Sequence, residues 1–150
     1  MNLFQEINKV EQLNSQITRL IKENDYRLIA GDKKWIIFDK DEQLVQVVIN
    51  KKDFEEELIL STILFSDIGT SMEIFIRNIV CERKIREMAK QDQFGRNGYK
   101  IEMIRFIKLK GNPLSKDILA RQLKSFTKKA KRIKEEVDSL LDYLMFVKLN

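Results

Sequence analysis

The sequence predicts an α+β fold, in which an antiparallel sheet is flanked by an N-terminal helix, a middle helix and a long C-terminal helix. Three observations support this prediction. Apolar residues recur at three- and four-residue spacings near both ends of the chain, as in amphipathic helices. Between these segments, short runs rich in β-branched and aromatic residues are separated by turn-forming residues, as in a β-meander. The 150 residues contain no Pro/Gly/Ser-rich linker, so we expect a single domain over residues 1–150.

The first expected element is a helix over about residues 3–23. Its apolar residues alternate three and four positions apart and are separated by polar residues, which places them on one face of a helix. This set comprises Leu3, Ile7, Val10, Leu13, Ile17, Leu20 and Ile21.

Four strands are expected next, at residues 26–30, 34–39, 43–50 and 56–66. The first two turns contain Gly31 and Asp32, and then Asp41, which are residue types that favour turns. The fourth segment is apolar enough to be a short buried helix instead, and its periodicity does not distinguish the two possibilities.

The second half of the chain predicts a helix, a loop, a strand and a final helix. Thr70 and Glu73 form a capping-box pattern at the start of a helix over residues 71–90, along which Met72, Phe75, Ile76, Ile79 and Met88 follow a helical spacing. The segment QDQFGRNG is expected to be a loop before a strand over 99–109, and Ser115 is the expected cap of the final helix.

The final helix carries a long apolar stripe with two possible roles. Its members alternate four and three positions apart: Leu119, Leu123, Phe126, Ala130, Ile133, Val137, Leu140 and Leu144. The stripe lies across the sheet, or part of it pairs with a second copy of the chain. Because the strands at 34–39, 43–50 and 58–65 are apolar on both faces, both sides of the sheet need cover. We therefore expect a homodimer.

The residue inventory argues against common catalytic and metal chemistry. The chain has no histidine and one cysteine, so the commonest general base, the commonest zinc ligand and thiolate clusters are missing. Asp39, Asp41 and Glu42 are interpreted as a hairpin turn, since their segment lacks the glycine and distal glutamate of a calcium loop. Residues 95–98 lack the spacing of a phosphate-binding loop and are interpreted as a turn. We expect no enzyme activity, cofactor or metal, and a buried structural thiol at Cys81.

The N-terminal segment does not resemble a signal peptide, because Glu6, Lys9 and Glu11 interrupt its apolar residues. The longest apolar run, residues 58–65, is far shorter than the roughly 20 residues that cross a bilayer. We expect a cytoplasmic protein that does not bind membranes.

The net charge of +5 is unevenly distributed. Residues 99–134 hold 12 Lys/Arg against 2 Asp/Glu. Five of these cations recur at three- and four-residue spacings along the final helix, roughly opposite its apolar stripe: Arg121, Lys124, Lys128, Lys131 and Arg132. They form either a solvated face or a surface for nucleic acid or an acidic protein. Arg96, in the expected loop, is a second candidate contact for a phosphate or carboxylate.

The segment FGRNGYKIEMIRFIKLKGNPLSKDILARQLKSFTKKAKRI, residues 94–133, resembles the end of YbjN-like domains. In those domains a glycine-containing turn and a strand precede a turn of the form Gly, short gap, Leu-Ser/Thr, and then a long final helix. YbjN-like domains share their fold with class I type III secretion chaperones, which are small cytoplasmic dimers that hold an extended segment of a client protein. The resemblance implies a binding role without chemistry.

Together these features predict a non-enzymatic, dimeric protein-binding module of the chaperone or adaptor type, whose partner is another protein, with an acidic protein as one option. The alternative is a basic protein of phage or mobile-element origin that binds nucleic acid, or blocks a nucleoprotein, through its C-terminal helix.

Overall fold

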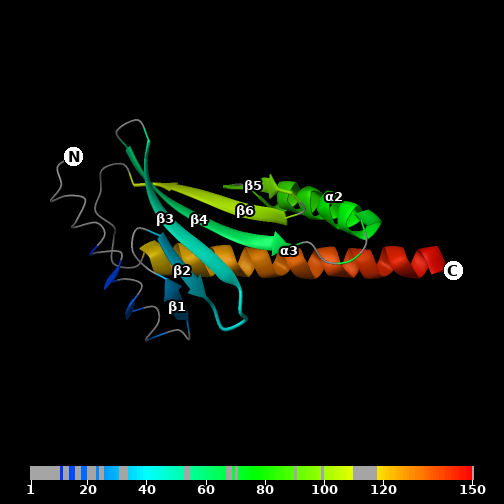
Figure 1. Cartoon of the computed structure of the whole chain (residues 1–150), viewed down its shortest axis with the longest axis horizontal. Helices are drawn as coiled ribbons and strands as arrows, with labels where there is room; N and C mark the ends of the chain where they lie inside the picture. Colours follow the sequence, from blue (N-terminus) through cyan, green and yellow to red (C-terminus); the bar gives the residue numbers. More distant parts are fainter. Residues whose placement is uncertain are drawn as a thin grey trace. The chain divides into compact units, whose positions relative to one another are not determined.

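The computed structural model of this chain describes residues 11, 14, 15, 18, 19, 23, 26–30, 34–52, 55–66, 69, 71–89, 91–98, 100–109 and 118–149. Its elements along the chain are β1 (Arg27–Ala30), β2 (Lys34–Phe38), β3 (Leu44–Lys52), β4 (Glu55–Phe65), α2 (Ser71–Met88), β5 (Asp92–Asn97), β6 (Lys100–Lys108) and α3 (Ile118–Leu149) (Figure 1). The expected α+β class is confirmed. No helix in this described part of the chain combines the length and apolar character needed to span a membrane.

The strands form one six-stranded sheet in the order β1-β2-β3-β4-β6-β5. Residues 56–66, for which strand and helix were both open, belong to strand β4. The pairs β1–β2, β2–β3 and β5–β6 are antiparallel, as a meander and a hairpin require. Strands β1 and β5 are the two edges of the sheet.

The chain divides into two compact units that are described separately. Unit 1 comprises Met1–Leu60 and Phe106–Thr127, and unit 2 comprises Ser61–Arg105 and Lys128–Asn150. The expectation of one domain over the whole chain stays a prediction.

Unit 1 has a core built from alternate residues of its strands and from the start of α3. The fully buried side chains include Trp35, Ile37, Val45, Val47, Leu58, Leu60, Leu119, Leu123 and Phe126. The indole Nε1 of Trp35 donates a hydrogen bond to the Asn14 side-chain oxygen at 2.6 Å, so the polar atom of this buried aromatic has a partner.

The acidic turn between β2 and β3 is stabilised by its own side chains, as the sequence indicated. Asp39 accepts hydrogen bonds from the backbone amides of Asp41 and Gln43, both at 2.9 Å. Glu42 has a left-handed φ of 61° and pairs with Arg27 of β1. These contacts show that the three acidic residues form and stabilise a hairpin turn.

Unit 2 has its own core, which is formed by β4, α2, β6 and the second half of α3. Its buried apolar side chains are Leu64, Phe65, Ile74, Cys81, Ile85, Ile101, Met103, Ala130, Ile133, Val137 and Leu141. The apolar stripe predicted along the final helix therefore lines both cores as far as Val137.

Two expectations lie largely outside the described residues. Of the expected helix over 3–23, only positions 11, 14, 15, 18, 19 and 23 are described, and their backbone is helical. All seven residues of its apolar stripe fall on undescribed positions, so the helix as a whole stays a prediction. The expected caps Thr70 and Ser115 also lie outside the described residues.

One expectation was wrong: the segment before β6 is strand β5 and not a loop. Asp92 to Asn97 pair residue by residue with β6, from Asp92 opposite Arg105 to Asn97 opposite Lys100. Gly98 follows with a left-handed φ of 64°, which a tight hairpin turn requires and glycine adopts without strain. A turn was expected over residues 95–98, but of these only Gly98 is in the turn and the first three belong to β5. The strand was missed because DQFGRN has a single apolar side chain.

Candidate protein-binding surface

Helix α2 has two apolar faces, although the sequence analysis identified one apolar spacing. One face is buried in unit 2 and contains Ile74, Asn78, Cys81 and Ile85. The other comprises Met72, Phe75, Ile76 and Ile79, and all four side chains are exposed. We call this second set the α2 row. Its residues follow the spacing i, i+3, i+4, i+7, so they lie on one side of the helix.

The last turns of α3 form a second exposed apolar surface. The helix buries Val137 and Leu141, but Leu140 and Leu144, the final members of the predicted stripe, are exposed. We define the α3 row as Leu140, Tyr143, Leu144 and Val147, which repeat the spacing of the α2 row. Met145 and Phe146 extend the exposed apolar surface beyond this row, with Phe146 exposed to 66%. The end of α3 is therefore apolar on nearly every side.

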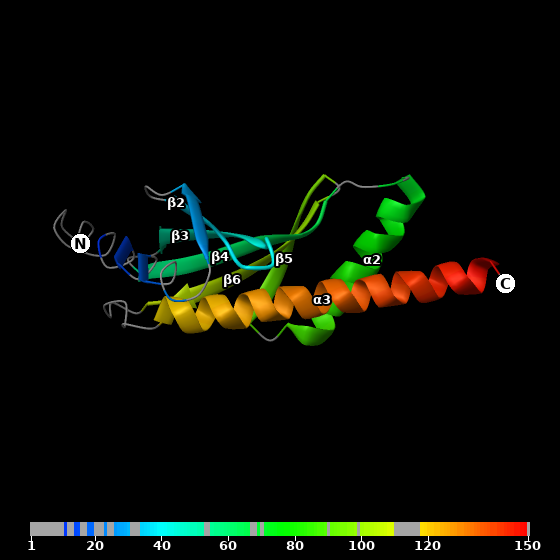
Figure 2. The ribbon, with the colours of Figure 1, turned by 90° about the horizontal axis from the view of Figure 1, so that it is seen from below.

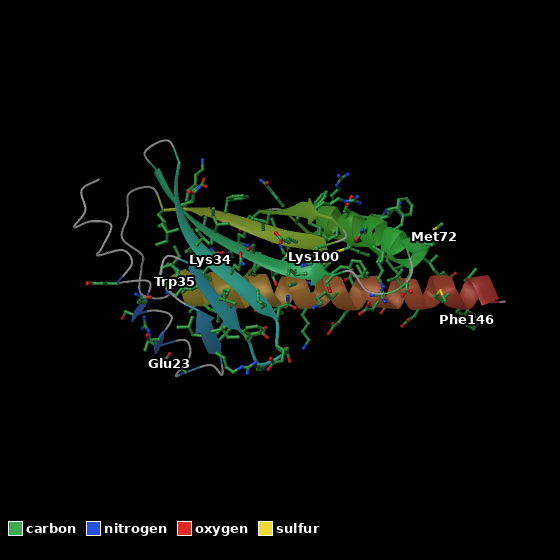
Figure 3. All side chains as sticks on the ribbon, viewed as in Figure 1. Glu23, Lys34, Trp35, Met72, Lys100 and Phe146 are labelled. Carbon is green, nitrogen blue, oxygen red and sulfur yellow. The ribbon has the colours of Figure 1, made fainter. Side chains whose placement is uncertain are left out.

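Two ion pairs hold α2 against α3 within unit 2. Arg77 approaches Asp138 at 3.3 Å, and Lys84, seven residues further along α2, approaches Glu136 at 3.2 Å. The second view shows α2 crossing the C-terminal half of α3 (Figure 2). Met72 at the start of α2 and Phe146 near the end of α3 both lie toward the right-hand end of the view (Figure 3). The exposed rows thus lie on two helices that contact each other within unit 2.

Unit 2 contains a buried ionic cluster of Asp92, Arg105 and Lys129. Arg105 donates from Nε and Nη2 to the two carboxylate oxygens of Asp92, at 2.6 and 2.9 Å. The Lys129 ammonium lies 2.8 Å from the second of these oxygens. The side chains of Asp92 and Arg105 are almost fully buried. The cluster thus connects β5, β6 and α3.

The charge of Asp92 is maintained by its partners. Burial alone raises the pKa of Asp92, but the hydrogen bonds from Arg105 and Lys129 outweigh this effect and hold the pKa below its ordinary value. Both carboxylate oxygens are bonded and the side chain has no exposed surface, so Asp92 is inaccessible to a reacting group. The geometry indicates a structural role.

Cys81 is buried on the inner face of α2. Burial, with a smaller contribution from the charge of Glu82, raises its pKa to about 12. The thiolate is the reactive form of cysteine, so a thiol with this pKa is a poor nucleophile near neutral pH. Among the described residues, no group of three or more Cys, Asp or Glu side chains is arranged to hold a metal ion.

The five predicted basic residues Arg121, Lys124, Lys128, Lys131 and Arg132 are all exposed on α3. Their exposure fits the expected polar side of the helix, and their use as a binding site stays a prediction. Lys129, which the sequence analysis did not single out, instead turns into the ionic cluster of unit 2.

Arg96 does not lie in a loop, because β5 includes it. Its guanidinium pairs with Glu82 of α2. One turn further along α2, the Arg86 guanidinium lies over the ring of Phe94, 5.1 Å from its centroid. Arg96 is thus partly neutralised by a carboxylate of its own unit, which weakens its candidacy as a contact for a phosphate.

Comparisons of the chain with protein-family models, with curated proteins and with solved structures find no match.

Proposed function

We propose that this protein is a non-enzymatic protein-binding module of the chaperone or adaptor type that works as a homodimer. The observation that carries this proposal is the exposed apolar surface of unit 2, formed by the α2 row and by residues 140–147 of α3. Ten large apolar side chains gathered on two helices are unusual for a surface that stays in water. Exposed patches of this kind are typical of protein interfaces.

The composition of the surface supports a protein partner. Its aromatic and methionine residues are Phe75, Tyr143, Phe146, Met72 and Met145, which are residue types enriched at protein interfaces. Unit 1 offers a smaller apolar surface on the edge strand β1, where Leu28 and Ile29 are exposed. A dimer and a client could therefore use different parts of the chain.

Affinity capture with the tagged full chain tests the proposal, using lysate with and without nuclease treatment. We expect a protein partner that survives nuclease and high salt, because apolar contacts are not screened. Phe75→Lys in unit 2 and Ile29→Lys in unit 1 place one charge on each exposed apolar surface. At least one of them should lose the partner, and Glu135→Lys, which changes an exposed charge on α3, should keep it. Retention by both apolar variants, or loss of all captured protein after nuclease, would contradict the proposal.

The exposure of the five predicted basic residues of α3 favours one alternative, a nucleic-acid-binding protein. If five cations each neutralised a phosphate, the logarithm of the affinity would fall with the logarithm of the salt concentration at a slope of about −4.5. Titration of a labelled duplex at several salt concentrations distinguishes the two functions. A steep salt slope together with nuclease-sensitive capture would favour this alternative, and it would suit a protein of phage or mobile-element origin.

A further inference from the structure

We infer that the α2 row of one copy packs against the α3 row of a second copy, and that the reciprocal contact completes a two-fold dimer. This inference rests on the dimer that the proposed function includes, and it assigns the surface and the partner. It leaves the exposed side chains of β1 free for a client.

The first argument is the match between the two rows. The α2 row occupies positions 72, 75, 76 and 79, and the α3 row occupies positions 140, 143, 144 and 147. Both follow the spacing 0, 3, 4, 7 and extend about 10 Å along their helices, at 1.5 Å per residue. This spacing is the same in either direction along the chain. The central residues of the two rows therefore face each other whether the helices pack parallel or antiparallel.

The second argument is that one chain carries both rows and leaves both exposed. Phe75 is exposed to 58% and Tyr143 to 64%, so the rows do not cover each other within one copy. Arg77 pairs with Asp138 and Lys84 pairs with Glu136 where α2 contacts α3, and both rows are uncovered in this arrangement. In a two-fold dimer, α2 of each copy contacts α3 of the other copy. The eight residues of the two rows are therefore covered in both copies.

The third argument is area. An aromatic side chain has about 150–250 Å² of surface, so the exposed parts of Phe75 and Tyr143, the aromatic members of the two rows, together amount to roughly 180–300 Å². A standard specific interface buries about 800 Å² from each partner. These two aromatic residues thus supply roughly a quarter to two fifths of the area that each partner of a stable dimer buries, and the six other residues of the two rows add to it.

A charge-pairing experiment tests the arrangement. Phe75→Lys places a cation in the α2 row, and Tyr143→Glu places an anion in the α3 row. Each variant alone should weaken its homodimer at least about 30-fold in Kd, as expected when an interface hot spot is lost. An equimolar mixture should form heterodimers, because one contact then joins the new cation to the new anion and the other contact keeps both native rows. Ile29→Lys, at a residue exposed to 64% on β1, is the control and should leave the dimer mass unchanged.

Light scattering and sedimentation measure the masses, and differently tagged copies report the heterodimer. A wild-type chain that stays monomeric up to about 100 µM would overturn the inference. Single variants that remain dimeric, or a mixture that forms no heterodimer, would overturn it as well. If either charged variant unfolds, Phe75→Ala and Tyr143→Ala replace the pair and should each weaken the dimer about tenfold. Client binding is measured separately, by affinity capture. A chain that is monomeric but still captures a partner would refute this arrangement and would leave the proposal of protein binding standing.

Discussion

Arg105 and Asp92 lie opposite each other on the paired strands β6 and β5, and the guanidinium of Arg105 binds both carboxylate oxygens of Asp92. The Lys129 ammonium of α3 completes the cluster. Each of these groups is costly to bury alone, and together they leave no unpaired negative charge. The pairing fixes the register of the β5–β6 hairpin and the position of α3 in unit 2.

The first prediction is that Asp92→Asn strongly destabilises the protein. The substitution preserves shape but leaves two cations close together in a buried site, and breaking a buried pair by removing one partner costs about 3–5 kcal/mol. Urea unfolding followed by circular dichroism gives the change in the free energy of unfolding. Asp142→Asn on the exposed side of α3 is the matched control, with an expected change below about 0.5 kcal/mol. A similar small change for Asp92→Asn would show that the cluster contributes little.

The second prediction concerns acid. The partners of Asp92 hold its pKa below the ordinary value of 3.8, so the folded state binds its proton less readily than the unfolded state does. The contribution of Asp92 to stability is therefore complete above the unfolded pKa and is lost as the pH falls through the folded pKa. Urea unfolding at pH 7, 5, 4 and 3 should show the stability difference between wild type and Asp92→Asn shrinking below about pH 4. A difference that stays constant down to pH 3 would contradict the assigned ion pairs.

The sequence was sufficient for the strands and helices whose apolar residues follow a clear period. The meander from β1 to β3, helix α2, strand β6 and helix α3 lie within a few residues of their expected positions. Strand β5 was missed because it has a glycine, charged residues and one aromatic in place of an alternating apolar pattern. Its pairing with β6 stabilises it, which is a tertiary effect that local propensity does not contain.

The candidate surface was harder to predict than the fold. The sequence placed Met72, Phe75, Ile76 and Ile79 on one side of a helix, but periodicity does not show whether that side is buried. A second row, with Ile74, Cys81 and Ile85, competes for the core and occupies it. One signal for the ionic cluster was available: Arg105 is in phase with the buried residues Ile101 and Met103, so an alternating strand directs it inward.

The third prediction is that Cys81 reacts slowly in the folded protein. The side chain is buried and its pKa is about 12, so the thiolate is scarce at pH 8. Labelling with an aromatic disulfide reagent at pH 8 should proceed at least about 100-fold more slowly in buffer than in 8 M urea, where the pKa returns toward about 8.5. Equal rates under the two conditions, with the fold intact in buffer, would show that the thiol is accessible.

The last prediction tests whether the basic residues of α3 bind a partner or only form a solvated face. Lys124, Lys128 and Lys131 are exposed, so reversing all three to Glu should change the free energy of unfolding by less than about 1 kcal/mol in total. Any loss of binding is then not a consequence of unfolding, and circular dichroism checks that the variant is folded. If the protein binds its partner through apolar contacts, the triple variant should retain that partner at high salt.

A nucleic-acid-binding function predicts the opposite result. Six units of charge change would then abolish binding, and the milder Lys→Gln changes would reduce the salt dependence in proportion to the number of phosphates that are no longer neutralised. Phe75→Lys provides the matched comparison, because it adds a single positive charge to the α2 row and leaves the basic residues of α3 intact. We expect the triple variant to keep its protein partner, since blocks of like charge on a helix commonly form a solvated face. A folded, dimeric triple variant that loses its partner would overturn the apolar-surface proposal and support the nucleic-acid alternative.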